Sequence, residues 1–220
     1  MHSYSIDTDA RKKVIIGIFI VSILLSTCLT YWLDGIIISL KMQLQQYVLI
    51  SQLLAICDAF GITTNFIGIP FLYAVLYALF DNILWRCKPF KKIFNIPDLR
   101  GHWEGKLTST TFPVTIDMSL DVRQTWSKIS FVSTFPKSTS VSDMASIFVE
   151  KNGIVKVGFG FINRSREFLH QYDGYNILEM DNDTHLFGRY FNNRDNSNIG
   201  EKSGNIGRFE LDKITKSKGD

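Results

Sequence analysis

Residues 14–33 form a stretch of 20 residues that contains no charged side chain. About 20 apolar residues in a helix span the hydrocarbon core of a bilayer. A second uncharged stretch covers residues 59–80. A cleaved signal peptide does not explain the first stretch, because the apolar run is too long and no small-residue cleavage site closes it. The sequence therefore predicts a membrane anchor over residues 1–96, with two transmembrane helices at about 14–33 and 59–80.

Basic residues near the ends of the two stretches predict the orientation of the anchor. Residues 11–13 read Arg-Lys-Lys before the first stretch, and Arg86, Lys88, Lys91 and Lys92 follow the second. The segment between the stretches contains only Lys41 as a basic residue. Because positive charge in short flanks stays on the cytoplasmic side, both termini and the domain that follows the second stretch are predicted to be cytoplasmic.

The uncharged, mostly apolar residues 42–57 allow three interpretations. They form an interfacial helix, an extension of the second span, or a short third span that would place the following domain outside the cell. The sequence leaves these alternatives open.

Small and polar residues recur at helical spacing in both stretches and predict close packing in the membrane. Such residues let helices approach each other closely, and polar groups among them seek partners in lipid. We expect them to mediate association between copies of the chain. They are Ser22, Ser26 and Thr30 in the first stretch and Gly61, Asn65 and Gly68 in the second.

Beyond a short basic linker, residues 97–220 alternate between apolar and polar side chains, which predicts an all-β domain. The clearest example is 114–122, where Val, Ile, Met, Leu and Val occupy every second position. A period of two is the signature of a half-buried strand. About eight short strands follow one another, near 102–108, 114–122, 129–135, 145–150, 154–163, 172–181, 184–192 and 205–213. We expect a small antiparallel up-and-down β-barrel, or else a sandwich, because an open sheet would leave unpaired edges.

Charge and cysteine content limit what this domain does. From residue 97 onward the chain has 16 basic and 16 acidic residues, so the domain is neutral. Long nucleic acids bind to strongly basic surfaces, so they are excluded as partners. The three cysteines, Cys28, Cys57 and Cys87, all lie in the anchor, as expected for a domain in a reducing compartment.

No arrangement of residues indicates catalysis or metal binding. The four histidines show no metal-ligand spacing, and there is no phosphate-binding glycine-rich loop before a helix. His102 and Glu104 lie two apart on one strand face, which is more typical of a solvated face than of a catalytic pair. We therefore predict a protein that is not an enzyme and has neither metal nor cofactor.

Several residues of the barrel are candidates for a small-ligand site, because eight strands enclose room for one small ligand. Gln124 continues the apolar face of its strand, so its amide would be buried and would need a partner such as a ligand. The other candidates supply aromatic faces, hydroxyls, an amide and a guanidinium: Trp103, Trp126, Ser138, Ser140, Asn163, Tyr190 and Arg194.

Taken in order, the motifs resemble a known family. Leu-Arg-Gly-His-Trp-Glu-Gly at 99–105 follows the two apolar stretches. After it come Gln-Thr-Trp-Ser-Lys-Ile at 124–129, a serine-rich run, Leu-Phe-Gly-Arg-Tyr-Phe at 186–191 and Gly-Asn-Ile at 204–206. This resembles the two-span, β-barrel effectors of bacterial cyclic-oligonucleotide antiphage (CBASS) systems.

The resemblance implies a function as well as a fold. In that family a phage-activated nucleotidyltransferase makes a cyclic dinucleotide, which the barrel binds. The effector then oligomerises in the bacterial inner membrane, membrane integrity fails, and the infected cell dies. Two alternatives remain: a membrane-tethered lipocalin-like barrel with an apolar interior and ligand, or a non-enzymatic adaptor module whose barrel is filled with side chains.

Overall fold

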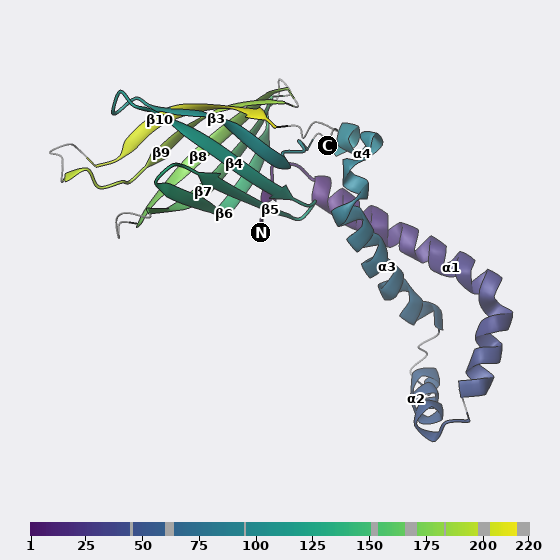
Figure 1. Ribbon diagram of the computed structural model, residues 1–220. Coiled ribbons are helices and arrows are strands. Elements are labelled where there is room, and N and C mark those ends of the chain that lie inside the picture. The colour runs from purple at the N-terminus through teal and green to yellow at the C-terminus, as the bar shows by residue number, and fades with distance from the viewer. Residues whose placement is uncertain are drawn as a thin grey trace, which may run out of the picture. The chain divides into compact units, whose positions relative to one another are not determined.

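The computed structural model describes residues 1–44, 46–59, 64–94, 96–150, 154–165, 171–182, 184–197 and 203–214. The chain forms two compact units (Figure 1). A helical unit contains residues 9–84, and a barrel unit combines residues 1–8 with residues 85–220. Residues 1–8 and 85–96, which the sequence assigned to the anchor, thus belong with the barrel.

The helical unit consists of α1 (Ala10–Leu44), α2 (Val48–Ala59) and α3 (Thr64–Asn82). Among the described residues, only α1 contains a segment long and apolar enough to cross a membrane, Ala10–Trp32. Most of that segment is exposed, which distinguishes it from the core helix of a soluble domain. α3 begins later than the predicted second span, and residues 60–63 lie outside the described residues. The described structure therefore supports one membrane-crossing helix where the sequence predicted two.

The connecting residues 42–57 are divided between the end of α1 and α2. α1 continues beyond its apolar part, through Asp34 and Lys41, to a length of 35 residues. α2 has 12 residues, fewer than the roughly 20 that a spanning helix needs.

The packing residues predicted in the apolar stretches join two helices of the same chain. α1 and α3 lie side by side (Figure 1). Ser22 and Ser26 are buried on α1, and a Cβ atom added at Gly68 of α3 would lie 3.3 Å from the Ser26 Oγ. The Ser22 and Thr30 hydroxyls donate to main-chain carbonyls one turn earlier in α1. Association between copies stays a prediction. Gly61 and the side chain of Asn65 lie outside what the structure describes.

The contact between Ser26 and Gly68 generates a prediction. Gly68→Leu should separate α1 from α3, because the space that its side chain needs is filled by Ser26. The rings of Phe19 on α1 and Tyr73 on α3 have centroids 6.5 Å apart, so a cysteine introduced at each position can form a disulfide across the contact. In lipid vesicles, Gly68→Leu should lower the yield of this disulfide several-fold relative to the same cysteine pair without Gly68→Leu. Gly17→Leu is the matched control, since its new side chain meets nothing within 4 Å. Equal yields in the two variants would contradict the predicted packing.

The barrel unit contains a closed, antiparallel, eight-stranded barrel, as the sequence predicted (Figure 1). Each strand pairs with its neighbours in chain order, and β10 pairs with β3 to close the ring. The strands are β3 (Gly101–Ser109), β4 (Thr115–Gln124), β5 (Lys128–Thr134), β6 (Ser138–Val149), β7 (Val155–Ser165), β8 (Gln171–Asn182), β9 (His185–Asn192) and β10 (Asn205–Lys213).

Two details of the strand pattern differ from the prediction. β6 begins at Ser138, so the serine-rich run is the first part of a strand and not a loop. Hydroxyl side chains hide the alternation there, because Ser140 and Ser142 point inward without being apolar. Two short strands near the N-terminus, β1 (His2–Ser3) and β2 (Ser5–Ile6), were not predicted and lie between β5 and β6.

Apolar side chains fill one half of the barrel, at the beginnings of β3, β5, β7 and β9. We call this half the packed end. Its largest fully buried side chains include Trp103, Phe131, Phe159 and Phe209, and the Phe131 and Phe159 rings stack with centroids 4.1 Å apart. Burial of such side chains stabilises a fold by about 1.5–3 kcal/mol each, so this half supports the other.

The segment that leads into β3 is held against the packed end. It contains the 3₁₀ turn η1 (Leu84–Arg86) and α4 (Lys88–Phe94), whose Phe94 ring packs edge-on against Trp126 at 5.0 Å. Both oxygens of Asp98 accept hydrogen bonds from Arg100 at 2.7 Å, and Lys91 of α4 lies 3.3 Å from one of them. Burial alone would raise the pKa of Asp98, but the hydrogen bonds and charges of Arg100 and Lys91 outweigh it and lower the pKa to about 2.

The lowered pKa of Asp98 predicts a pH-dependent contribution to stability. Asp98→Asn should lower the free energy of unfolding at pH 7 by about 2 kcal/mol, because the folded state favours the ionised carboxyl. That contribution is complete above the ordinary pKa of about 4 and disappears as the pH falls toward 2. Urea unfolding of the full chain at several pH values measures it. Asp117→Asn, at an exposed carboxyl of β4, is the control, and a deficit independent of pH would contradict the assignment.

Candidate ligand-binding site

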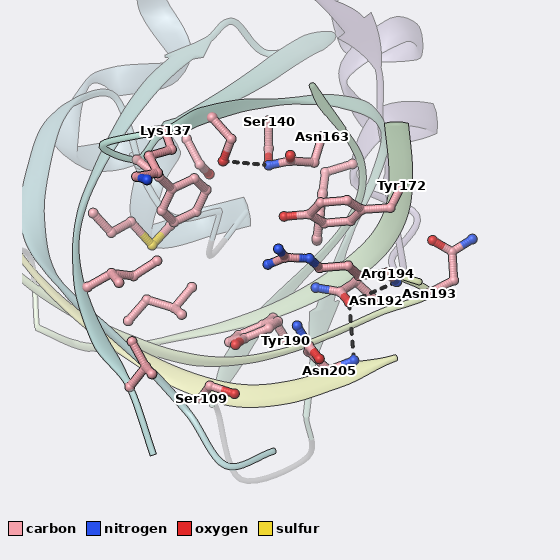
Figure 2. A pocket seen from close by; sticks show the side chains of 18 of the residues that line it. Ser109, Lys137, Ser140, Asn163, Tyr172, Tyr190, Asn192, Asn193, Arg194 and Asn205 are labelled. Atoms are coloured by element: carbon pink, nitrogen blue, oxygen red, sulfur yellow. Dashed lines mark hydrogen bonds between the residues drawn. The ribbon is translucent and has the colours of Figure 1, made fainter. Parts of the chain in front are cut away.

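A cavity of about 760 Å³ occupies the half of the barrel opposite the packed end (Figure 2). It lies where β3, β5, β7 and β9 end and where β4, β6, β8 and β10 begin. This volume falls in the range typical of small-molecule sites. The lining residues are Leu107, Ser109, Phe112, Val114, Ile116, Met118, Ser133, Phe135, Pro136, Lys137, Ser138, Ser140, Phe161, Asn163, Gln171, Tyr172, Asn176, Tyr190, Asn192, Asn193, Arg194, Asp195, Asn196 and Asn205.

The inner face of most strands changes from apolar to polar along the barrel axis. On β8 the buried Leu178 of the packed end is followed by Asn176 at the next inward position toward the cavity. On β10 the corresponding change is from Phe209 to Asn205. Alternation keeps all these residues on the inside, and only their chemistry changes. The result is a cavity with an apolar wall on β3 to β5 and a polar wall on β6 to β10.

Asn163 forms the most deeply buried polar group of the cavity wall. It is fully buried on β7, opposite Ser140 of β6. Its Nδ2 donates to the Oγ atoms of Ser140 at 2.7 Å and Ser138 at 3.2 Å (Figure 2). Its Oδ1 is buried and has no hydrogen-bond partner among the residues that the structure describes. A buried polar atom without a partner is costly in a folded protein, so it marks a position where a ligand donor gains a hydrogen bond.

Arg194 brings a positive charge into the cavity between two tyrosines (Figure 2). Its guanidinium carbon lies 6.0 Å from the centre of the Tyr172 ring. Burial raises the pKa of both Tyr172 and Tyr190, although a hydrogen bond with a serine and the charge of Arg194 oppose the shift in each case. Both phenols are therefore protonated at neutral pH and available as hydrogen-bond donors.

An asparagine network shapes the chain around Arg194. The Asn192 Oδ1 accepts from the main-chain nitrogens of Arg194 and Asn205, both at 3.2 Å. Asn196 in turn donates to the Asn205 Oδ1 at 2.9 Å. These bonds join the end of β9 to the start of β10 and fix the backbone that carries the guanidinium.

Tyr190 lies flat against the barrel wall because β10 has a glycine opposite it. Tyr190 pairs with Gly207, and a Cβ atom added there would lie 2.5 Å from the Tyr190 ring. Such an atom would also collide with the Thr108 carbonyl oxygen, so a larger residue at position 207 would displace the backbone of β3, the Tyr190 ring or both.

Five of the eight predicted ligand residues line the cavity: Ser138, Ser140, Asn163, Tyr190 and Arg194. The other three, Trp103, Gln124 and Trp126, lie at the packed end, and all are buried. The Trp103 Nε1 donates to the Leu99 carbonyl at 2.9 Å. Gln124, which was expected to need a ligand partner, accepts from the Leu99 main-chain nitrogen at 3.0 Å and donates to the Pro97 carbonyl at 3.1 Å. These residues thus have partners within the protein and do not reach the cavity.

Sequence reasoning missed Tyr172 and four asparagines: Asn176, Asn193, Asn196 and Asn205. A signal for them exists in the sequence. Asn176, Asn192 and Asn205 occupy the same alternate, inward-facing positions of their strands as the apolar residues of the packed end. Polar residues at such positions therefore mark the half of the barrel that contains the cavity.

His102 and Glu104 lie on the outer surface of the barrel, away from the cavity. The His102 ring nitrogens lie 2.8 Å from Asp121 and 3.0 Å from Glu104, and all three side chains are exposed. Hydrogen bonds with Asp121 and then Glu104 raise the pKa of His102. This arrangement matches a solvated strand face. In the described part of the chain, no group of three or more histidine, cysteine, aspartate or glutamate residues could hold a metal ion.

A closed barrel that is packed at one end and hollow and polar at the other is the architecture of a small-ligand receptor. Residues 94–203 match the model of the family described as Cap15, cyclic dinucleotide receptor domain. The match covers half of the chain and most of the barrel, and the chain belongs to this family. No curated protein is similar enough to the chain to count as a match. Family and fold together point to the role of a sensor.

Because Gln124 lies at the packed end, a substitution there should change the stability of the barrel without changing its affinity for a ligand. Gln124→Ala should lower the free energy of unfolding by about 1–3 kcal/mol, because it leaves the buried Leu99 main-chain nitrogen without an acceptor. The ligand affinity of the folded protein should stay unchanged. Urea unfolding and calorimetric titration of the same full-length preparation measure the two quantities. A loss of affinity with unchanged stability would return Gln124 to the ligand site.

Proposed function

We propose that the cavity binds a cyclic dinucleotide made by a partner nucleotidyltransferase, and that the protein is an antiphage effector of the CBASS type. The observation that carries this proposal is the position of Arg194, whose positive charge lies between Tyr172 and Tyr190 in the cavity. The chain belongs to a family of cyclic dinucleotide receptor domains, and such a ligand carries phosphate groups. Guanidinium groups form strong, charge-assisted hydrogen bonds with phosphate.

The two walls of the cavity suit the two parts of such a ligand. A cyclic dinucleotide has a ring with two phosphates and two bases with apolar faces and polar edges. Arg194 and the Tyr172 hydroxyl are placed to contact phosphate. The amides of Asn163 and Asn176 suit base edges, since amides pair with the donors and acceptors of bases. Phe135, which follows β5 on the apolar side, and Phe161 of β7 offer faces for the bases, where stacking contributes about 1–3 kcal/mol per base.

The polar wall also argues against the two alternatives. A lipocalin-like carrier of apolar ligands would have an apolar interior throughout, whereas hydroxyls, amides and Arg194 line one side of this cavity. An adaptor module would have a barrel filled by side chains, whereas here about 760 Å³ is open.

The apolar helix provides the second half of the proposed function. α1 exposes large apolar side chains along the part that is long enough to cross a membrane. We propose that α1 and the second predicted span, which overlaps most of α3, insert into the bacterial inner membrane with both termini and the barrel in the cytoplasm. Two helices enclose no conducting path, so several copies must assemble, and ligand binding would drive that assembly. The membrane then fails and the infected cell dies.

Binding is tested on the full chain in detergent. Addition of cyclic di-AMP, cyclic di-GMP or cyclic di-UMP should raise the thermal midpoint of the barrel, because a ligand at a hundred times its dissociation constant stabilises a protein by about 2.7 kcal/mol. Arg194→Gln should weaken the binding about 10- to 100-fold, through the loss of a charge-assisted hydrogen bond. Arg189→Gln, on the outer face of the same strand as Tyr190, is the matched control and should bind as the wild type does. Equal affinities in the two variants would remove Arg194 from the site.

The membrane step has its own readout. Co-expression with an active nucleotidyltransferase should admit a membrane-impermeant dye into cells that make the wild-type protein but not Arg194→Gln. Dye entry without any change in crosslinked oligomers would contradict assembly as the cause of the damage.

A further inference from the structure

One seam of the barrel is built differently from the others. β5 and β6 pair directly only over three residue pairs at the cavity half: Val132 with Val141, Ser133 with Ser140, and Thr134 with Thr139. Toward the packed end the two strands separate and leave a slot between them. The N-terminal residues of the chain fill this slot, as β1 and β2.

The inserted segment supplies main-chain partners to both sides of the slot. His2 and Ser3 pair antiparallel with the start of β5, and Ser5 and Ile6 pair in parallel with the end of β6. The main-chain nitrogen of Asp7 adds a hydrogen bond to the Ile147 carbonyl at 3.0 Å. Between the two short strands, Tyr4 is buried, with only 3% of its surface exposed. The segment is thus a ninth component of the barrel wall.

Ser142 lies where β5 and β6 part. Its Oγ accepts a hydrogen bond from the main-chain nitrogen of Phe131 at 2.9 Å and contacts the His2 Nε2 at 2.8 Å. The register of β6 shifts directly after Ser142. One buried hydroxyl therefore ends the direct pairing of the two strands and anchors the tip of the inserted segment.

The same stretch of β6 forms part of the cavity wall. Ser140, two residues before Ser142, holds the Asn163 amide and pairs with Ser133 across the seam. A ligand that rests against Ser140 and Asn163 therefore acts on a strand whose position depends on the inserted segment. In the other direction, the segment continues through Thr8 and Asp9 into α1.

We propose that the slot between β5 and β6 is a strand-binding site that is coupled to the cavity. The N-terminal segment positions the part of β6 that contacts the ligand, and ligand binding in turn holds the segment in its slot. Ser142 and His2 are positioning residues, since neither lines the cavity. The coupling rests on the proposed function, and it makes the first eight residues the route by which ligand occupancy reaches the apolar helix.

Hydrogen–deuterium exchange on the wild-type full chain in detergent tests the coupling without a variant. The probes are cyclic di-AMP, cyclic di-GMP and cyclic di-UMP, each at a saturating concentration where it binds. A bound probe should slow amide exchange in residues 3–7 about five-fold or more, because coupling between sites typically changes equilibria by at least that factor. Unchanged exchange with the cavity saturated would overturn the coupling and leave the proposed function intact. Binding of none of the three probes would overturn the proposed function and the coupling together.

A pair of variants measures the same coupling from the other side. Ser142→Ala removes the shared hydroxyl and should weaken binding of the probe about five-fold or more, by the reciprocity of linked equilibria. It should also speed exchange in residues 3–7. Ser119→Ala, on β4 outside the slot and the cavity, is the matched control and should change neither quantity. An affinity within two-fold of wild type for Ser142→Ala would overturn the role of Ser142 as a positioning residue.

Discussion

Continuous main-chain hydrogen bonding around the barrel holds the strands, the cavity and the N-terminal segment in place. A strand edge without a neighbour exposes unpaired amide and carbonyl groups, and closure of the ring removes this cost. Seven of the eight seams close by direct pairing of neighbouring strands along their length, and the eighth needs residues 2–6 to complete it. The N-terminal segment therefore has two roles: it completes the barrel wall, and it leads directly into α1.

Closure of the barrel creates an interior with two halves, one filled by apolar side chains and one that contains the ligand-binding cavity. At the packed end, stacked Phe131 and Phe159 and the buried Trp103 hold the strands in fixed positions. The polar half tolerates amides and hydroxyls because the packed half stabilises the fold; they include the Asn163 Oδ1, which has no partner within the described part of the chain. A cavity held open in this way binds its ligand without first paying for the ordering of its walls.

Much of this arrangement was predictable from local pattern. The strict alternation of residues 114–122 identifies β4 and its inward face, and similar patterns identify the other seven barrel strands. The pattern failed where inward residues are polar. Ser140 belongs to a strand but resembles a loop residue, and Gln124 faces inward as predicted but finds its partners in Leu99 and Pro97. Inward direction is a local property, whereas the identity of the neighbour depends on segments distant in sequence.

The apolar helix, the β domain behind it and the family of that domain could all be predicted from the amino-acid sequence, because each depends on composition and spacing along a short stretch of chain. Which inward residues share the cavity became known only from the folded barrel. Ser140, Asn163 and Tyr172 come from three different strands and Arg194 follows the end of β9, so their meeting depends on the register between strands. The folded barrel also shows that residues 2–6 belong to its wall, since a segment so short has no periodicity of its own and is ordered only by the two edges that it joins.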